Sequence, residues 1–337
     1  MIEILSVTFP FFALIAIGYL AARTRALPAA AVPGLNTFVL YFALTCMLFK
    51  LGQRTPTSDL LDPAVLGLWV AAGLAVMALA VVPGRRRGLG WRDAAFGGLI
   101  AVLPNSGFMG VPLLMALLGA QAAGPISASL LVDVALMQSV AVALAHYGRR
   151  AEGGSLWREL AAQARRVAGN PMPWAIVLGG LASGFSVRLP GPVDAVVAML
   201  AASATPVALF TIGAMLAREG APRASGVRGG SGGGFWRRRG QALRAATGDD
   251  VAWLATCKLF AHPLLMWGLG RGMIAAGLPL GEGALTVLTL TAALPAAANV
   301  AVLAERYGAD SGRVARVILI STVVSFATFT VAVALLT

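Results

Sequence analysis

The residues best placed to do chemistry lie at 103–114, LPNSGFMGVPLL. They sit inside a long apolar segment, yet Pro104, Asn105 and Gly107 fall close together. Proline removes a backbone donor and clashes with the preceding helical turn, which leaves carbonyl groups unpaired. Such backbone is tolerated at membrane depth only where it is buried in protein or lines a polar cavity. The stretch therefore predicts a broken helix that offers backbone groups and an amide to a small ligand.

A second apolar segment repeats this pattern in LPAAANVAVL, where Pro295 is followed by Asn299. Two broken helices that cross would present half-helix ends to one spot. The N-terminal ends carry partial positive charge and free N–H groups, which suit an anion. The alternative is a proline-kinked helix whose asparagine caps its own backbone. Because the pattern occurs twice, we favour a binding site.

Two charged residues, Asp133 and Lys258, fall well within apolar segments. An ionisable group inside a membrane is costly and is a functional candidate by default. Either the two form a structural ion pair, or Lys258 meets a substrate carboxylate while Asp133 takes up a proton. Arg306, beside Glu305 at the end of an apolar run, is predicted to be interfacial. His262 is predicted to be a hydrogen-bonded packing residue.

The elements that position these residues are predicted to be membrane helices. Apolar residues make up 58% of the 337 and charged residues 12%, whereas about a quarter of a soluble domain is charged. Apolar runs of about 20 residues, the length that crosses a bilayer, recur along the chain. The ten predicted spans are 3–22, 33–51, 64–83, 94–118, 126–147, 171–187, 192–217, 251–276, 283–304 and 314–336. The chain is predicted to be an all-α polytopic membrane protein.

The net charge of +12 is a signal of membrane orientation. Loops after odd-numbered spans hold 21 of the 26 basic residues, and loops after even-numbered spans hold four. The positive-inside bias places the odd loops in the cytoplasm and both termini on the non-cytoplasmic side of the inner membrane. We therefore expect the lipid bilayer, and no nucleic acid, as a partner.

Metal and enzyme chemistry receive little support from the sequence. The two cysteines, Cys46 and Cys257, lie in apolar spans, and two histidines are too few for a multi-histidine metal centre. Walker A and HExxH motifs are not found in the sequence, and the GxSxG pattern occurs only as GGSGG (229–233) within a Gly- and Arg-rich stretch, not between a strand and a helix as a nucleophile elbow requires. The chain is predicted not to be an enzyme, with no metal and no cofactor beyond a possible coupling proton or sodium ion.

The chain also repeats itself. Residues 44–52 align with 205–213 at an offset of 161, and Leu103-Pro104 aligns with Leu294-Pro295 at an offset of 191. The extra 30 residues match a Gly/Arg-rich segment, 218–249, which is predicted to be a flexible cytoplasmic loop. Two repeats of five helices are predicted, and the odd number inverts the second. Inverted repeats are typical of alternating-access carriers. The predicted organisation is 1–148 for the first repeat, 149–170 for a cytoplasmic connector and 171–337 for the second repeat.

The opening stretch resembles the fourth-span signature of the auxin efflux carrier family, which includes plant auxin carriers and bacterial organic-acid transporters. SLLVDVALMQ (129–138), KLFAHPLLMW (258–267) and VLAERYGAD (302–310) extend the resemblance over nearly the whole chain. The resemblance implies crossing broken helices four and nine, and a dimeric scaffold of spans 1, 2, 6 and 7. It also implies a transport domain of spans 3–5 and 8–10 that moves like an elevator. Leu44-Thr45 departs from the family's usual Leu-Pro, so that break is expected to be softened or missing.

We therefore expect a homodimeric secondary carrier of small mono- or dicarboxylates. The alternatives are a carrier of a neutral or cationic solute, which Asp133 could select, and a channel lined by the broken helices. Asp133 and Lys258 are expected to serve ion coupling or to form an ion pair. The predicted substrate contacts are Pro104, Asn105, Ser106, Gly107, Gln138, Pro295, Asn299 and Thr45.

Overall fold

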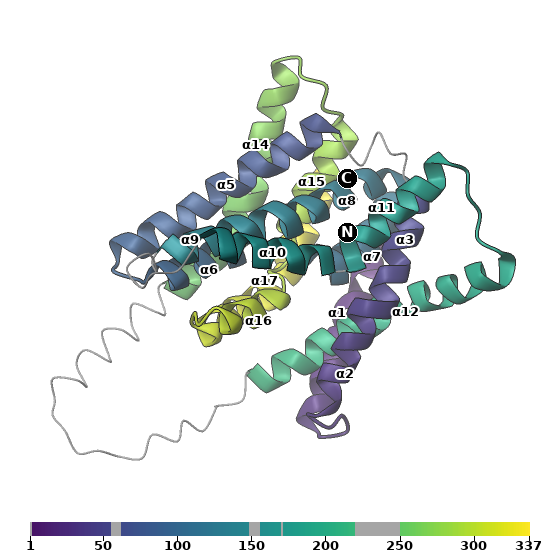
Figure 1. Ribbon diagram of the computed structural model, residues 1–337, viewed down its shortest axis with the longest axis horizontal. Coiled ribbons are helices and arrows are strands. Elements are labelled where there is room, and N and C mark those ends of the chain that lie inside the picture. The colour runs from purple at the N-terminus through teal and green to yellow at the C-terminus, as the bar shows by residue number, and fades with distance from the viewer. Residues whose placement is uncertain (1, 55–61, 148–155, 170, 220–249) are drawn as a thin grey trace.

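A computed structural model describes residues 2–54, 62–147, 156–169, 171–219 and 250–337 of the chain, and every regular element among them is a helix (Figure 1). The all-α prediction is therefore confirmed. Several of these helices are long and apolar enough to cross a membrane, as a multi-pass membrane protein requires. In the described part of the chain these are Ala31–Arg54, Pro63–Arg86, Ser106–Tyr147, Gly191–Ala217 and Ser311–Leu336.

The helices follow one another along the chain. In the first half they are α1 (Ile2–Arg23), α2 (Ala31–Phe38), η1 (Val39–Ala43), α3 (Leu44–Arg54), α5 (Pro63–Arg86), α6 (Trp91–Val102), η2 (Ser106–Gly110), α7 (Val111–Leu118), η3 (Gly119–Ala122), α8 (Ala123–Val132), η4 (Asp133–Met137) and α9 (Gln138–Tyr147). In the second half they are α10 (Leu156–Gly169), α11 (Pro171–Gly184), α12 (Gly191–Glu219), η6 (Cys257–Ala261), α14 (His262–Ala275), α15 (Glu282–Ala293), α16 (Asn299–Arg306) and α17 (Ser311–Leu336). Residues 250–256 are helical and lead into η6.

Local sequence explains where several helices begin. The Asp62 carboxylate accepts hydrogen bonds from the backbone N–H groups of Ala64 and Val65, and Pro63 occupies the first helical position of α5. Both features favour a helix start, since the first N–H groups have no partner inside the helix. The Asp310 carboxylate caps α17 in the same way by accepting from the N–H of Arg313.

The helices gather into two groups, which Figure 1 shows side by side. The first helix group comprises α1, α3, α11 and α12, joined by the short α2 and η1. In it α1 packs along α12, and α3 packs along both α11 and α12. The second helix group comprises α5, α6, α8, α9, α14, α15 and α17, with α5 against α6 and α14, and α15 against α17.

Glycines permit the closest helix contacts in the first helix group. A Cβ added at Gly18 of α1 would lie 2.0 Å from the carbonyl oxygen of Phe210 in α12. A Cβ at Gly213 of α12 would lie 1.9 Å from the carbonyl oxygen of Ile15 in α1. Backbones can approach this closely only where no side chain intervenes, which is how helices associate within lipid.

Glycines also permit the close packing of α3 against α11. A Cβ added at Gly52 would lie 2.4 Å from the carbonyl oxygen of Ile176, and one added at Gly179 would lie 2.2 Å from that of Phe49. These four contacts mean that the first helix group is held together by backbone-to-backbone packing at two matched places.

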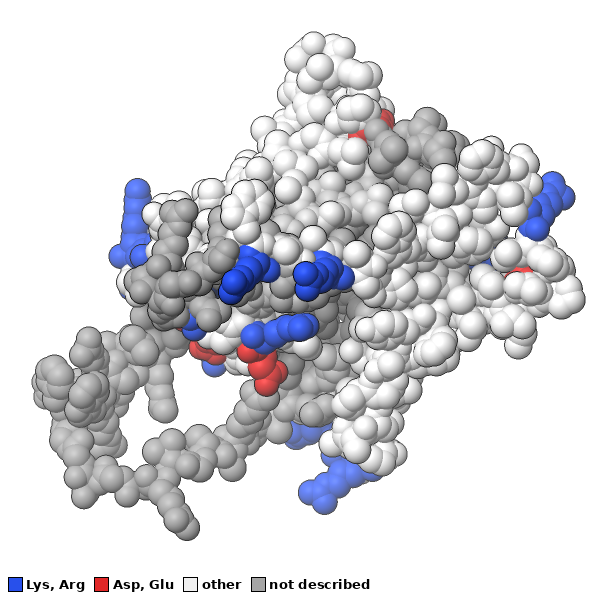
Figure 2. Space-filling view, viewed as in Figure 1, with Lys and Arg blue, Asp and Glu red and all other residues white. Residues whose placement is uncertain are grey.

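The outer surface is largely apolar, as a lipid-facing surface must be. Large apolar side chains such as Leu178, Met199 and Val323 are exposed. Figure 2 shows that white atoms cover most of the described surface in view and that Lys and Arg side chains gather at a few places. This distribution fits a multi-pass membrane protein.

Within the 149–170 connector, residues Leu156–Gly169 form the helix α10. Two further local predictions have different outcomes. The break expected near Leu44-Thr45 appears as a π-helical turn at Val39–Ala43, immediately before α3, so the helix is softened rather than interrupted. Most of the predicted 218–249 loop lies outside the described residues.

Candidate functional site

The two Leu-Pro sequences each interrupt a helix. Leu103 follows the last residue of α6 with an extended backbone (φ −69°, ψ 109°), and Leu294 follows α15 with φ −62° and ψ 155°. A residue before proline is pushed out of the helical region by steric contact with the proline ring. The predicted breaks at Pro104 and Pro295 are therefore confirmed.

The two interrupted segments cross and bond to each other. Pro104 and Ala296 form an isolated antiparallel bridge. The N–H of Asn105 donates to the carbonyl oxygen of Pro295 at 2.8 Å, and the N–H of Ala297 donates to that of Leu103 at 3.0 Å. Each break thereby satisfies backbone groups of the other, as burial requires.

Helical structure resumes on both chains directly after the crossing. The Asn105 carbonyl oxygen accepts from the N–H groups of Met109 and Gly110, at 3.1 and 3.0 Å, and so starts η2 and α7. On the other chain α16 starts at Asn299. Because the first N–H groups of a helix lack partners within it, two partly positive N-termini meet near the crossing.

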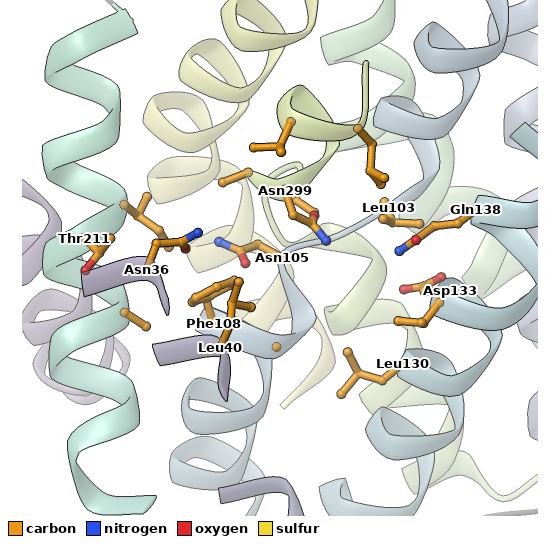
Figure 3. Close-up of a pocket in the computed structure, with 18 of the residues that line it drawn as sticks. Asn36, Leu40, Leu103, Asn105, Phe108, Leu130, Asp133, Gln138, Thr211 and Asn299 are labelled. Atoms are coloured by element: carbon orange, nitrogen blue, oxygen red, sulfur yellow. The ribbon is translucent and has the colours of Figure 1, made fainter. Parts of the chain in front are cut away.

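A cavity of about 480 Å³ lies at the crossing, between the two helix groups (Figure 3). The first helix group lines one side of it, with residues of α2, η1, α11 and α12. The residues of that side are Asn36, Leu40, Tyr41, Pro171, Ala208, Thr211, Ile212 and Met215. The opposite side comes from the crossing itself, from α8, η4 and α9, and from α16.

Amide side chains are the main polar groups of the cavity. Asn105 is only 4% exposed and Gln138 9%, and neither side chain has a hydrogen-bond partner among the described residues. Figure 3 shows the amides of Asn36 and Asn105 pointing toward one another, with Asn299 beside them. Buried amides normally find partners, so these are groups that a ligand could satisfy.

Asp133 also lines the cavity, and it is 3% exposed. Its Oδ1 accepts a hydrogen bond from the indole Nε1–H of Trp69 at 2.8 Å. Its Oδ2 is buried and has no partner among the described residues. One carboxylate oxygen is thus held in place while the other is left for a proton or a ligand.

Lys258 lies elsewhere. Its side chain is fully buried and is not part of the cavity lining. The Nζ donates to the carbonyl oxygen of Ala292 at 2.8 Å and lies 3.1 Å from Nδ1 of His262. A cation is favourable there, because Ala292 belongs to the last turn of α15 and the C-terminal end of a helix is partly negative. Among the described residues Lys258 and Asp133 form no direct ion pair, and Lys258 lies outside the cavity in which it was expected to meet a substrate.

The other predicted site residues divide into three sets. Pro104, Asn105, Gly107, Gln138 and Asn299 line the cavity. Ser106 and Pro295 stand at the crossing but outside the lining, Ser106 with its hydroxyl buried. Thr45 also lies outside the lining, since its hydroxyl donates to the carbonyl oxygen of Leu40 at 2.9 Å.

The polar lining residues that had not been predicted as site residues include Asn36, Thr211 and Arg306. Arg306 could have been found, because it lies seven positions after Asn299 and therefore on the same face of a helix. Thr211 lies in the aligned 205–213 segment, but its neighbours there are apolar. Asn36 stands outside every repeated or family-like segment, so the sequence carried no signal for it.

An all-helical protein whose apolar helices are interrupted and cross at an internal cavity has the architecture expected of a membrane transporter. Comparison with known proteins identifies the class as membrane transporters, not enzymes. A family model described as "Membrane transport protein" matches residues 4–156 and 145–333, so the chain belongs to that family. The resemblance to auxin efflux carriers is thereby confirmed.

One curated relative is similar over nearly its whole length. It is a protein of Rhizobium meliloti (strain 1021) named "Putative malonate transporter". The two chains are 31% identical over 336 residues, which is 98% of this chain and 95% of the relative.

Proposed function

We propose that the protein is a secondary carrier of small organic anions, either mono- or dicarboxylates. The observation that carries the proposal is the meeting of two half-helix N-termini with the unpaired Asn105 amide in one cavity. N–H groups and positive helix ends favour a carboxylate. The name of the relative, "Putative malonate transporter", supports the same class of substrate.

The proposed mechanism is an elevator-like shift of the second helix group against the first. The cavity lies between the two groups, as alternating access requires. Gly18 and Gly179 are 161 positions apart, and so are Gly52 and Gly213. These glycines make equivalent contacts in the α1–α12 and α3–α11 pairs. This match supports ten spans arranged as two inverted repeats, with the first helix group as the scaffold and the second as the transport domain.

The remaining parts of the proposal concern assembly and orientation. The scaffold helices form a homodimer in the inner membrane, with both termini on the non-cytoplasmic side. A proton or a sodium ion is the coupling ion. Flux measured in proteoliposomes under opposed proton and sodium gradients identifies which of the two drives transport.

Replacement of Asn105 by Ala tests the proposal. We expect Asn105→Ala to abolish specific carboxylate flux in proteoliposomes while expression and melting temperature stay close to wild type. Ser129→Ala is a suitable control, since that hydroxyl is buried, donates to the carbonyl oxygen of Ile126 and lies outside the cavity. Wild-type flux in Asn105→Ala would refute a substrate site at the crossing.

A neutral or cationic substrate is the second candidate, because Asp133 lines the cavity. The variant Asp133→Asn distinguishes a carrier of cations from a carrier of anions. A cation carrier should lose binding, whereas an anion carrier should keep or improve it, since a like charge has been removed from the cavity. Saturable flux with counter-transport distinguishes either carrier from a channel.

A further inference from the structure

The inference concerns Arg306, which is the sole basic residue among the described residues that line the cavity. Arg306 is exposed and has no hydrogen bond or ion pair with another described residue. An arginine in the last turn of a helix commonly does no more than interact with the helix dipole. Its place in the cavity indicates a more specific role.

One face of α16 connects Arg306 to the crossing. Asn299, Val302, Leu303 and Arg306 are spaced i, i+3, i+4 and i+7, which is one face of a helix, and all four line the cavity. Seven residues rise about 10 Å along a helix axis. Helical side chains lean toward the N-terminus, so the long side chain of Arg306 is expected to extend from the last turn of α16 in the direction of Asn299.

The position of Arg306 also places it at one end of the cavity. With the orientation proposed above, the end of α16, the end of α12 at Met215 and the start of α11 at Pro171 all lie toward the cytoplasm. All three regions line the cavity. The crossing forms the deep end, and Arg306 stands at the cytoplasmic mouth.

We propose that Arg306 binds the second carboxylate of a dicarboxylate whose first carboxylate occupies the half-helix N-termini at the crossing. The inference rests on the proposed function and makes Arg306 the residue that distinguishes dicarboxylates from monocarboxylates. A guanidinium binds a carboxylate through two parallel hydrogen bonds. Asp133, the acidic residue in the lining, repels a second carboxylate from its own side and so directs it toward Arg306.

Binding of four acids to purified protein tests this assignment. Malonate and succinate carry two carboxylates, and propionate and butyrate are monocarboxylates of the same chain lengths. We expect Arg306→Gln to weaken malonate and succinate binding about fivefold, the scale of one partly exposed charge contact. Propionate and butyrate binding should change less than about twofold. Arg306→Lys, which keeps the charge but not the paired hydrogen bonds, should give an intermediate loss.

Arg316→Gln is the matched control, because Arg316 is exposed on α17 outside the cavity. It should leave the binding of all four acids unchanged. Equal losses for mono- and dicarboxylates in Arg306→Gln, or no loss for either, would overturn the role of Arg306 and leave the carrier function standing. If the wild-type protein binds none of the four acids, the proposed function fails and the assignment fails with it.

Discussion

The N–H of Asn105 donates to the carbonyl oxygen of Pro295, and this bond joins the two halves of the chain at the edge of the cavity. The residue predicted to meet the substrate is therefore positioned by the break in the other repeat. A shift of either interrupted segment would displace the Asn105 amide. The crossing and the binding site form one structural unit, and the predictions below test what holds it.

Loss of the Ser321 hydroxyl should loosen the crossing. The Ser321 Oγ accepts from the N–H of Ala296 at 3.1 Å, next to the bridge with Pro104. Ser321→Ala leaves that buried N–H without a partner, which costs about 1–3 kcal/mol. Ser325→Ala on the same helix is the control, since its hydroxyl donates only to the carbonyl oxygen of Thr322. Chemical or thermal unfolding in detergent should show the larger loss for Ser321→Ala, and equal losses would contradict this account.

Asp133 and Lys258 should behave as residues with different partners. In Asp133→Asn the amide oxygen can still accept the hydrogen bond from Trp69, so the free energy of unfolding should change by no more than about 1 kcal/mol. Lys258→Met removes the donor to Ala292 and the contact with His262, which should cost about 1–3 kcal/mol. Melting of both single variants and the double variant measures this. If both single variants were equally destabilised and the double variant recovered the lost stability, the result would support a direct ion pair between Asp133 and Lys258 instead.

A methyl group at Gly18 should separate α1 from α12. Its Cβ would clash with the Phe210 carbonyl oxygen, and that backbone atom cannot turn aside as a side chain would. We expect Gly18→Ala to lower the free energy of unfolding by about 3 kcal/mol or more. At Gly67 of α5 an added Cβ would meet nothing within 4 Å, so Gly67→Ala should melt close to wild type. A wild-type melting temperature for Gly18→Ala would disprove this close packing.

A buried ion pair and an exposed ion pair of the second helix group should differ in strength. Arg313, 2% exposed, donates through Nε to the buried Asp250 carboxylate at 2.5 Å, whereas Arg271 and Glu282 form an exposed pair. Asp250→Asn leaves a buried guanidinium without its counter-charge and should cost about 3–5 kcal/mol. Glu282→Gln should cost less than about 1 kcal/mol. The free energy of unfolding, measured at low and high salt, should depend on salt mainly through the exposed pair. A small effect of Asp250→Asn on that free energy would contradict a strong contribution from the buried pair.

The sequence by itself determined the helical class, the membrane setting and the positions of the two central breaks. These follow from local physics. A proline acts on the few residues beside it, and an apolar run of sufficient length must be helical within lipid. For this reason Pro104, Pro295, Asn105 and Asn299 were found without any knowledge of the packing.

The tertiary structure alone decided which other polar groups share the cavity and which do not. Asn36 and Thr211 reach it from the first helix group, while Lys258 turns to Ala292 and Thr45 bonds within its own helix. The partner of a side chain depends on how far its helix is rotated about its own axis. That rotation is set by contacts far away in the chain, such as the glycine contacts between α1 and α12, and no local pattern records it.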